Sequence, residues 1–275
     1  MRTLALVAGL CICATRGAQA EDVAKPGAGW SGRTALSTSL LPPGAEFQTR
    51  AWHDLRGFAL GALANASPDY VYAGAWARWP ATRFLALRLE ALGVGYWPLP
   101  VAGAGYYALP DANAPRDRAH LAAGDGQAAA GASVTAAGTL QGIWKVGAGG
   151  QLLVSSSSSA EAVEIGDGPY FVNLRADLTQ ARADLIVGND ALLAFVLPVR
   201  PQLRVGVADS ARLAALSGSG WHLDGLVAAL AWDQPFRDVV SLEVGARAGV
   251  FTHHPVRAGQ VSIATWLAAQ WAFTH

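Results

Sequence analysis

Cysteine is scarce in this chain: Cys11 and Cys13 are the two cysteines among 275 residues, and both lie in an apolar stretch at the N-terminus. That stretch has the form of a secretory signal, with Arg2 before an apolar core at Leu4–Ala14 and a small-residue cleavage site at Ala18-Gln19-Ala20. Cleavage there removes both cysteines. The mature chain then has no disulfide framework and no thiolate metal site.

Long apolar runs and an excess of one charge are also missing. The apolar core of the N-terminal stretch is shorter than the ~20 residues that a membrane-spanning helix needs. Charged residues make up 15% of the chain and apolar residues 52%, with Lys+Arg and Asp+Glu equal at 20 each. This balance excludes a basic surface for nucleic acid and an acidic tail. Instead, it predicts apolar residues that are spread one in two along β-strands.

Alternation of apolar and polar residues is the strongest pattern that is present. The clearest example is Ser241–Phe251, in which Leu, Val and Ala at even positions alternate with odd positions that include Glu243 and Arg247. Because successive side chains of a strand leave opposite faces, this period of two predicts a β-strand. The same pattern recurs at 83–97, 133–146, 172–179, 181–187, 202–208 and 260–273. A change of parity near Gln180 predicts a turn or a bulge there.

The connections between these segments are of two kinds. Short turns are predicted at 79–83, 146–150, 178–182, 199–202 and 232–237, and longer loops near 98–128, 155–168, 209–220 and 252–259. They indicate about twelve strands, or ten if 188–190 is a bulge, with Phe47–Ala64 as a poorly alternating first strand. The serines 155–159 predict a solvated loop or a strand that runs beyond the membrane. Loop 98–128 is either a constriction inside a lumen or an external loop.

On these residues the chain resembles the outer-membrane β-barrel proteins of Gram-negative bacteria as a class. The resemblance rests on Ala18-Gln19-Ala20, on the repeated alternation and on the terminal strand Gln260–Phe273, which ends in an aromatic residue although Thr274 and His275 follow. It implies an all-β fold, a transmembrane antiparallel up-and-down β-barrel in the cell outer membrane, reached by export through the periplasm. The implied domains are a signal peptide at 1–20, an N-terminal periplasmic segment at 21–46 and the barrel at 47–275. The implied partners are outer-membrane lipid and, during biogenesis, the barrel-assembly machinery.

Aromatic residues provide an independent indication of the membrane. Those beside the predicted turns and loops form two sets about one strand length apart, as two interfacial girdles would. The girdle residues are Trp79, Trp97, Trp144, Tyr170, Trp221, Trp232, Trp271 and Phe273. The alternative is a soluble periplasmic β-sandwich that binds a ligand, with the aromatic residues in its core. A sandwich would carry a richly charged outer face, whereas the second face here mixes Gly, Ala, Ser, Gln and isolated ions.

Charged residues on the polar faces are the first candidates for function, because in a barrel they would line the lumen. They are Arg88, Glu90, Lys145, Arg175, Asp177, Arg182, Asp184, Arg204, Glu243 and Arg247. In a narrow barrel such charges pair and fill the interior, whereas a barrel of ~12 strands leaves a polar passage. The leading function is therefore a small-solute channel or binding protein, or a structural membrane protein. Glu243 and Arg247 are too far apart to pair, so we expect their partners among Arg204, Asp224 and the polar face of 260–273.

His222 and Asp224 are the catalytic candidates. They lie two residues apart on the strand face opposite Leu223, and we expect them at an inward-facing rim. A histidine beside a carboxylate can act as a general base. The alternative function is therefore an outer-membrane hydrolase or lipid-modifying enzyme, which is less favoured because no nucleophile motif is present. His253-His254 lacks a third ligand at a useful spacing, so neither a metal nor a cofactor is predicted.

Overall fold

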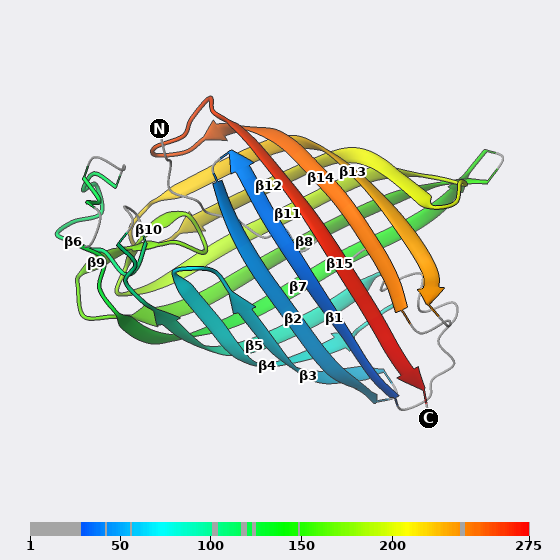
Figure 1. The fold of residues 1–275 in the computed structure, drawn as a ribbon, viewed down its shortest axis with the longest axis horizontal. Coiled ribbons are helices and arrows are strands. Elements are labelled where there is room, and N and C mark those ends of the chain that lie inside the picture. Colours follow the sequence, from blue (N-terminus) through cyan, green and yellow to red (C-terminus); the bar gives the residue numbers. More distant parts are fainter. Residues whose placement is uncertain are drawn as a thin grey trace.

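The computed structural model describes residues 29–274, except 42, 56, 101–103, 117–119, 123–124, 148 and 237–239. The predicted signal peptide at 1–20 therefore lies outside the described residues. Within them, all regular elements are β-strands, and twelve of these close into a barrel (Figure 1). No helix in this part of the chain is long and apolar enough to cross a membrane.

The barrel is an antiparallel up-and-down sheet that β1 and β15 close by pairing with each other. Its strands are β1 (Gly29–Leu41), β2 (Pro43–Leu55), β3 (Phe58–Ala66), β4 (Tyr70–Pro80), β5 (Leu85–Tyr96), β7 (Ala129–Val146), β8 (Gly150–Ile165), β11 (Ala183–Leu197), β12 (Gln202–Ala214), β13 (Gly220–Phe236), β14 (Val240–His253) and β15 (Val261–Thr274). A separate sheet contains β6 (Ala108–Leu109), β9 (Tyr170–Asn173) and β10 (Leu178–Ala181). The predicted fold and twelve strands are confirmed, and the β-sandwich alternative is wrong.

The two ends of the barrel differ in their connections. At one end, here called the short-turn end, brief turns follow β2, β4, β7, β11 and β13, and the strand termini Gly29 and Thr274 lie there. The other end, here called the loop end, carries the three longest connections: 97–128, 166–182 and 254–260. Four of the five predicted short turns lie at the short-turn end. The fifth, at 178–182, is instead β10 itself and Arg182, which leads into β11 at the loop end.

Alternation along each strand separates an apolar outer wall from a more polar interior. On β14, Glu243 and Arg247 are buried inside, whereas Val244 and Val250 are exposed outside. Large aliphatic side chains are exposed around the outer wall, among them Leu89, Leu140, Leu193, Leu226 and Leu267. An apolar wall around a polar interior is the arrangement that a barrel needs in lipid.

The barrel begins earlier than the sequence predicts. β1 and the start of β2 lie within the predicted periplasmic segment 21–46, and residues 47–64 are divided between β2 and β3. The alternation of β1 is weak because its outer face carries threonines. Their hydroxyl groups bond across strands, Thr34 to Thr49 at 3.2 Å and Thr38 to Thr265 at 2.9 Å. Cross-strand pairs of this kind let a polar side chain occupy an apolar wall.

The predicted strand 172–179 is wrong, because these residues form the β9–β10 hairpin. The turn occupies 174–177, where the Asn173 side-chain carbonyl accepts a 3.0 Å bond from the Ala176 N–H. Asp177 then adopts the left-handed conformation, with a φ of 54°, which Asp tolerates better than most residues. Apolar and polar residues continue to alternate in sequence through the turn, so the pattern resembles one straight strand, although the pairing of Val172 with Thr179 places an even and an odd position on the same face.

Two predicted loops are also largely strand. The serines 155–159 lie within β8, where the Ser157 and Thr139 hydroxyl groups bond at 3.0 Å. β12 continues to Ala214, which leaves 215–219 as the connection to β13. On β8 the serine hydroxyl groups bond to side chains of neighbouring strands. A polar stretch that suggested a loop can therefore form a strand.

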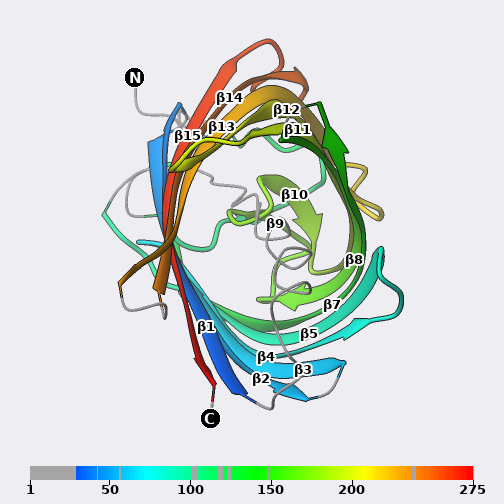
Figure 2. The ribbon, with the colours of Figure 1, turned by 90° about the vertical axis from the view of Figure 1, so that its right-hand side faces the viewer.

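The β9–β10 hairpin lies inside the barrel at the loop end (Figure 2). Its apolar side chains join inward side chains of the wall in one buried cluster. The hairpin contributes Phe171, Val172, Leu174 and Leu178, and the wall contributes Tyr72, Leu92, Val163, Trp221 and Phe251, among others. The loop half of the lumen is therefore filled by a packed plug, and the short-turn half is lined by polar side chains.

Candidate functional site

The short-turn half of the lumen is strongly basic. Within six residues of the strand ends, five arginines face inward: Arg33, Arg50, Arg78, Arg88 and Arg204. Glu90 and Glu243 are the carboxylates among them, and Lys145 and Asp54 lie further out at the exposed rim. Among the described side chains, guanidinium groups thus outnumber the carboxylates that face them. The opposite wall is neutral, with Ser, Thr and Gln side chains on β7 and β8.

Glu243 is the centre of one ion-pair cluster. Its carboxylate lies 3.2 Å from Arg204 and 3.5 Å from Arg33, and it accepts a 2.9 Å hydrogen bond from the Trp266 indole N–H. The expected partner Arg204 and a partner on 260–273 are therefore both found. Asp224 is not among them, because it faces the outside.

Glu90 is the centre of a second cluster. It lies 3.3 Å from Arg88 and 3.9 Å from Arg50, so one carboxylate faces two guanidinium groups. Arg78 is directly opposite Arg88 in register and makes no ion pair with a described residue. The two clusters therefore place four guanidinium groups around two carboxylates.

Arg33, Arg50 and Arg78 are functional candidates that the sequence reasoning missed. Arg33 and Arg50 are in register on β1 and β2, within the stretch whose alternation is weak. One signal could have identified Arg50, because Glu46, Gln48 and Arg50 alternate with Phe47, Thr49 and Ala51.

The other predicted lumen residues have different places. Arg182 is exposed at the loop end, 3.4 Å from the exposed Glu164, because it lies between β10 and β11 rather than on a strand. Asp184 is buried at the loop end and accepts N–H bonds from Leu216 at 2.8 Å and Ser217 at 3.3 Å. It therefore anchors the β12–β13 connection. Arg247 donates to the Ser210 hydroxyl at 3.0 Å and to the Leu223 carbonyl at 2.9 Å inside the wall.

Arg175 and Asp177 fix the plug to the barrel. Arg175 pairs with Glu161 on β8, and its guanidinium carbon lies 4.5 Å from the centre of the Tyr72 ring on β4. On the other side, the Trp221 indole N–H donates a 2.7 Å bond to the Ala176 carbonyl. These contacts hold the hairpin turn between distant parts of the wall.

Asp177 is the acceptor of a buried network with the loop 254–260. It pairs with Arg257 and with the His254 Nε2 at 2.9 Å. The His254 Nδ1 accepts N–H bonds from Val256 at 3.0 Å and Arg257 at 3.1 Å, which places the ring proton on Nε2. Burial lowers the pKa of His254 from 6.5 to about 3, and the nearby Arg116 and His253 add to this effect. His254 is therefore neutral in the closed plug.

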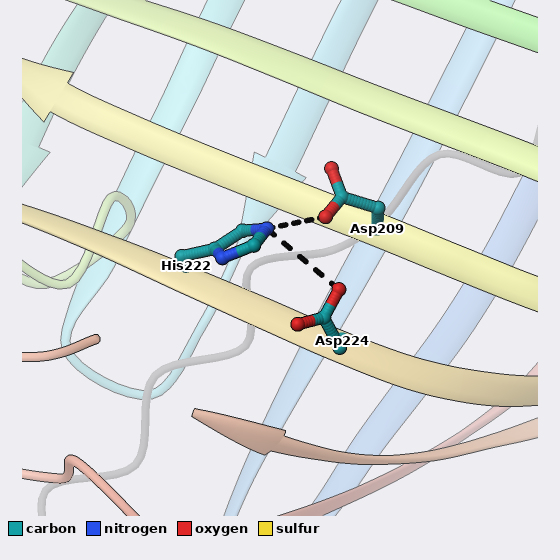
Figure 3. Close-up of side chains that lie close together, drawn as sticks. All are labelled: Asp209, His222 and Asp224. Carbon is teal, nitrogen blue, oxygen red and sulfur yellow. Dashed lines mark hydrogen bonds and ion pairs between the residues drawn. The ribbon is translucent and has the colours of Figure 1, made fainter. Parts of the chain in front are cut away.

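His222 and Asp224 lie on the outer wall, which corrects the expectation of an inward rim. Leu223 is buried inside, so its neighbours on the strand face outward. The His222 Nε2 bonds to Asp209 of β12 and lies 3.7 Å from an Asp224 oxygen (Figure 3). The three ligand atoms lie within 4.8 Å of one another, an arrangement that could hold a metal ion. Sequence reasoning missed Asp209, which β12 places directly opposite Asp224.

The predicted aromatic girdles are present in part. Trp79, Trp144 and Trp232 are exposed on the outer wall near the short-turn end. Trp221 is buried inside, and Tyr170 lies on β9, within the plug, and packs against the buried cluster. Trp97 bonds to the Pro68 carbonyl at the loop end, and Trp271 is partly buried beside Gly32. The side chain of Phe273 lies outside the described part of the chain.

Comparison with known proteins defines the fold without defining a family. No family model and no curated protein matches the chain. LpxR from Salmonella typhimurium is similar in structure, with a TM-score of 0.51 and 10% identity over 88% of this chain and all of LpxR. The beta domain of the Bordetella autotransporter BrkA has a TM-score of 0.51 and 9% identity, over 90% of this chain and all of that domain. With the closed twelve-strand barrel, these similarities show that the chain has the fold of bacterial outer-membrane β-barrels.

Proposed function

We propose that this barrel binds small anionic solutes in the short-turn half of its lumen, and that the β9–β10 plug controls their passage. The observation that supports the proposal is that, among the described side chains, five inward guanidinium groups lie around the two carboxylates of Glu90 and Glu243. Guanidinium groups bind carboxylates and phosphates through paired N–H donors. A solute of that class would neutralise the charge that the wall leaves.

A purely structural ion-pair network explains the arrangement less well. In such a network each buried cation has a counter-ion, because an uncompensated charge in a low dielectric costs several kcal/mol. Here Arg33 and Arg204 share Glu243, Arg50 and Arg88 share Glu90, and Arg78 lies beside Arg88 without an ion-pair partner among the described residues. The facing wall on β7 and β8 carries Ser and Thr side chains and, among the described residues, adds no carboxylate at this end.

The plug argues against free diffusion through the closed form. Phe171, Leu174 and Leu178 are fully buried against the wall. The hairpin is continuous with β8 and β11 at its two ends, so passage requires it to swing or loosen. Control of passage therefore lies in the contacts of Arg175 and Asp177.

Bilayer conductance of the refolded chain tests this proposal. We expect low conductance for the wild type, and anion-selective conductance when residues 170–181 are replaced by a short Gly-Ser linker. In that background, Arg50→Gln with Arg78→Gln should move the reversal potential in a salt gradient toward cation selectivity. The matched control is Lys145→Gln at the exposed rim, which should move it little. A cation-selective or non-conducting linker variant that still migrates as a folded barrel on unboiled gels would overturn the proposal.

A further inference from the structure

The outer wall carries a polar cluster where an apolar surface would be expected. Asp209 on β12, His222 and Asp224 on β13 and Thr252 on β14 all face outward near the loop end. Below them the same wall is apolar, with Val207 and Leu226 exposed. A charged side chain on the lipid face destabilises a barrel unless it is near the interface or neutralised.

Strand geometry gives the depth of the cluster in the membrane. Trp232, on the outer wall near the short-turn end, lies ten residues from His222 along β13. At ~3.3 Å per residue and a tilt of ~40°, this separation is about 25 Å along the membrane normal. The apolar band of such barrels is also ~25 Å tall. His222 is therefore at the outer edge of the band, where headgroup phosphates and their counter-cations gather.

The two carboxylates of the cluster need a cation. Asp209 and Asp224 are directly opposite each other in register, a position in which like charges repel. The nearest arginines on these strands, Arg212 and Arg247, face the interior, where Arg212 pairs with Asp190 at 2.6 Å. The guanidinium groups of both arginines therefore bond to groups on the inner side of the wall, away from Asp209 and Asp224. One imidazolium at His222 could neutralise a single carboxylate and would leave the second.

Hydrogen bonds on both ring nitrogens hold the His222 imidazole between the two carboxylates and Thr252. The Thr252 hydroxyl lies 3.4 Å from the His222 carbonyl, to which it donates, and 2.8 Å from the His222 Nδ1. Because a carboxylate only accepts, the hydrogen bond to Asp209 places a ring proton on Nε2. A metal ion that displaces this proton would meet the Nε2 lone pair and both carboxylates together, and the Nδ1–H could then donate to the Thr252 hydroxyl. An outer partner that fixes the tautomer in this way is typical of a metal-binding histidine.

We infer that Asp209, His222 and Asp224 bind a divalent metal ion on the outer wall, with Thr252 positioning the imidazole. Two carboxylate oxygens and one imidazole nitrogen suit Mn²⁺ and Zn²⁺. Three protein ligands leave coordination positions open on the side that faces the headgroups. Because the three ligand atoms lie within 4.8 Å of one another, one ion can contact all of them after small side-chain adjustments.

Metal titration of the refolded, chelator-treated barrel tests this inference. Loss of the free Mn²⁺ signal in electron paramagnetic resonance should reveal one site per chain, and Zn²⁺ should compete for it. Asp209→Asn, His222→Gln and Asp224→Asn should each weaken binding at least tenfold. Thr252→Val should weaken it about 10–100-fold through loss of the outer partner. The affinity should also fall as the solution is acidified, because protons compete with the metal for its ligands.

Matched variants separate this site from weak binding to any exposed acidic group. The control is His53→Gln with Asp54→Asn, an adjacent histidine and aspartate near the other end of the barrel, which should leave the titration unchanged. Heat-modifiable migration on unboiled gels shows that each variant is folded. Wild-type binding equal to that of a folded variant with both Asp209→Asn and Asp224→Asn would overturn the inference.

Discussion

At the scale of single residues, Glu243 is the side chain on which the basic half of the lumen most depends. Its carboxylate is 4% exposed and serves Arg33, Arg204 and the Trp266 indole. We expect Glu243→Gln to destabilise the barrel by about 3 kcal/mol, because two buried guanidinium groups lose their shared counter-charge. Urea unfolding of the refolded protein, followed by tryptophan fluorescence, measures the loss.

A surface ion pair provides the control for this prediction. Glu164 is exposed and lies 3.4 Å from the exposed Arg182, so Glu164→Gln should change stability by less than about 1 kcal/mol. Equal losses for the two variants would show that the lumen charges are hydrated rather than mutually dependent.

Gly245 is a second position where a single atom matters. A Cβ there would lie 2.0 Å from Trp266, whose ring covers the glycine while its N–H bonds to Glu243. We expect Gly245→Ala to cost about 1–3 kcal/mol by overpacking, measured by the same urea unfolding. Gly138→Ala is the comparison, because the nearest atom to its Cβ would be 3.7 Å away. A neutral Gly245→Ala would mean that Trp266 moves without loss.

At the scale of elements, the β9–β10 hairpin should respond to pH through His254. In the docked hairpin its pKa is about 3, whereas a released, solvated imidazole has the ordinary value of 6.5. Above pH 6.5 the ring is neutral in both states. As the pH falls below 6.5 the released state takes up a proton that the docked state does not, so docking weakens by about 1.4 kcal/mol per pH unit. The charged groups facing the ring are Asp177, Arg257, Arg116 and His253.

Hydrogen exchange measures this response. After correction for intrinsic rates, protection of the amides at 178–181 should fall about tenfold or more between pH 7 and pH 5. His254→Phe should remove the pH dependence, and the exposed neighbour His253→Gln should retain it. Protection that is constant over this range would show that His254 is not the group linked to docking.

How much of each element the sequence predicts depends on whether its alternation is unbroken. β14 and β15 can be predicted from the sequence because nearly every second residue is apolar, and these residues form the outer face of each strand. β1 does not, because Thr34 and Thr38 place hydroxyl groups on the lipid side and satisfy them on β2 and β15. The hairpin is hidden because residues 172–179 alternate in sequence even through its turn, although Val172 and Thr179 face each other in register.

The outer-wall cluster shows a similar limit. The two-residue spacing places His222 and Asp224 on one face, which the sequence identifies. Which side of the wall that face lies on depends on the burial of Leu223, and burial follows only from barrel closure. Asp209 and Thr252 come from neighbouring strands, and strand register cannot be read from one sequence. The residues of this one cluster therefore come together only through the register of three neighbouring strands.

At the scale of the whole molecule, closure depends on the pairing of the first and last barrel strands. Thr38 and Thr265 are directly opposite each other on β1 and β15. We expect cysteines at these two positions to form a disulfide in the refolded mature chain, because opposed residues of paired strands have Cα atoms within bonding reach. Boiled, non-reduced protein should then migrate differently from the reduced protein.

A displaced cysteine provides the control for closure. Thr34 is opposite Ala269 rather than Thr265, so cysteines at 34 and 265 should remain free thiols. Equal cross-linking of both pairs would indicate that β1 and β15 slide past each other or are not paired.

The pairing of β1 with β15 also imposes an order in time on assembly. Residues 29–41 cannot complete their hydrogen bonding until residues 261–274 have arrived, so the nascent sheet carries two open edges for most of its formation. Contacts between such distant segments form late and slowly. The hairpin lies between β8 and β11, in the middle of the chain, and is already tethered inside the curve of the sheet when the last strand arrives. We therefore expect the barrel to close around its plug, rather than to receive it afterwards.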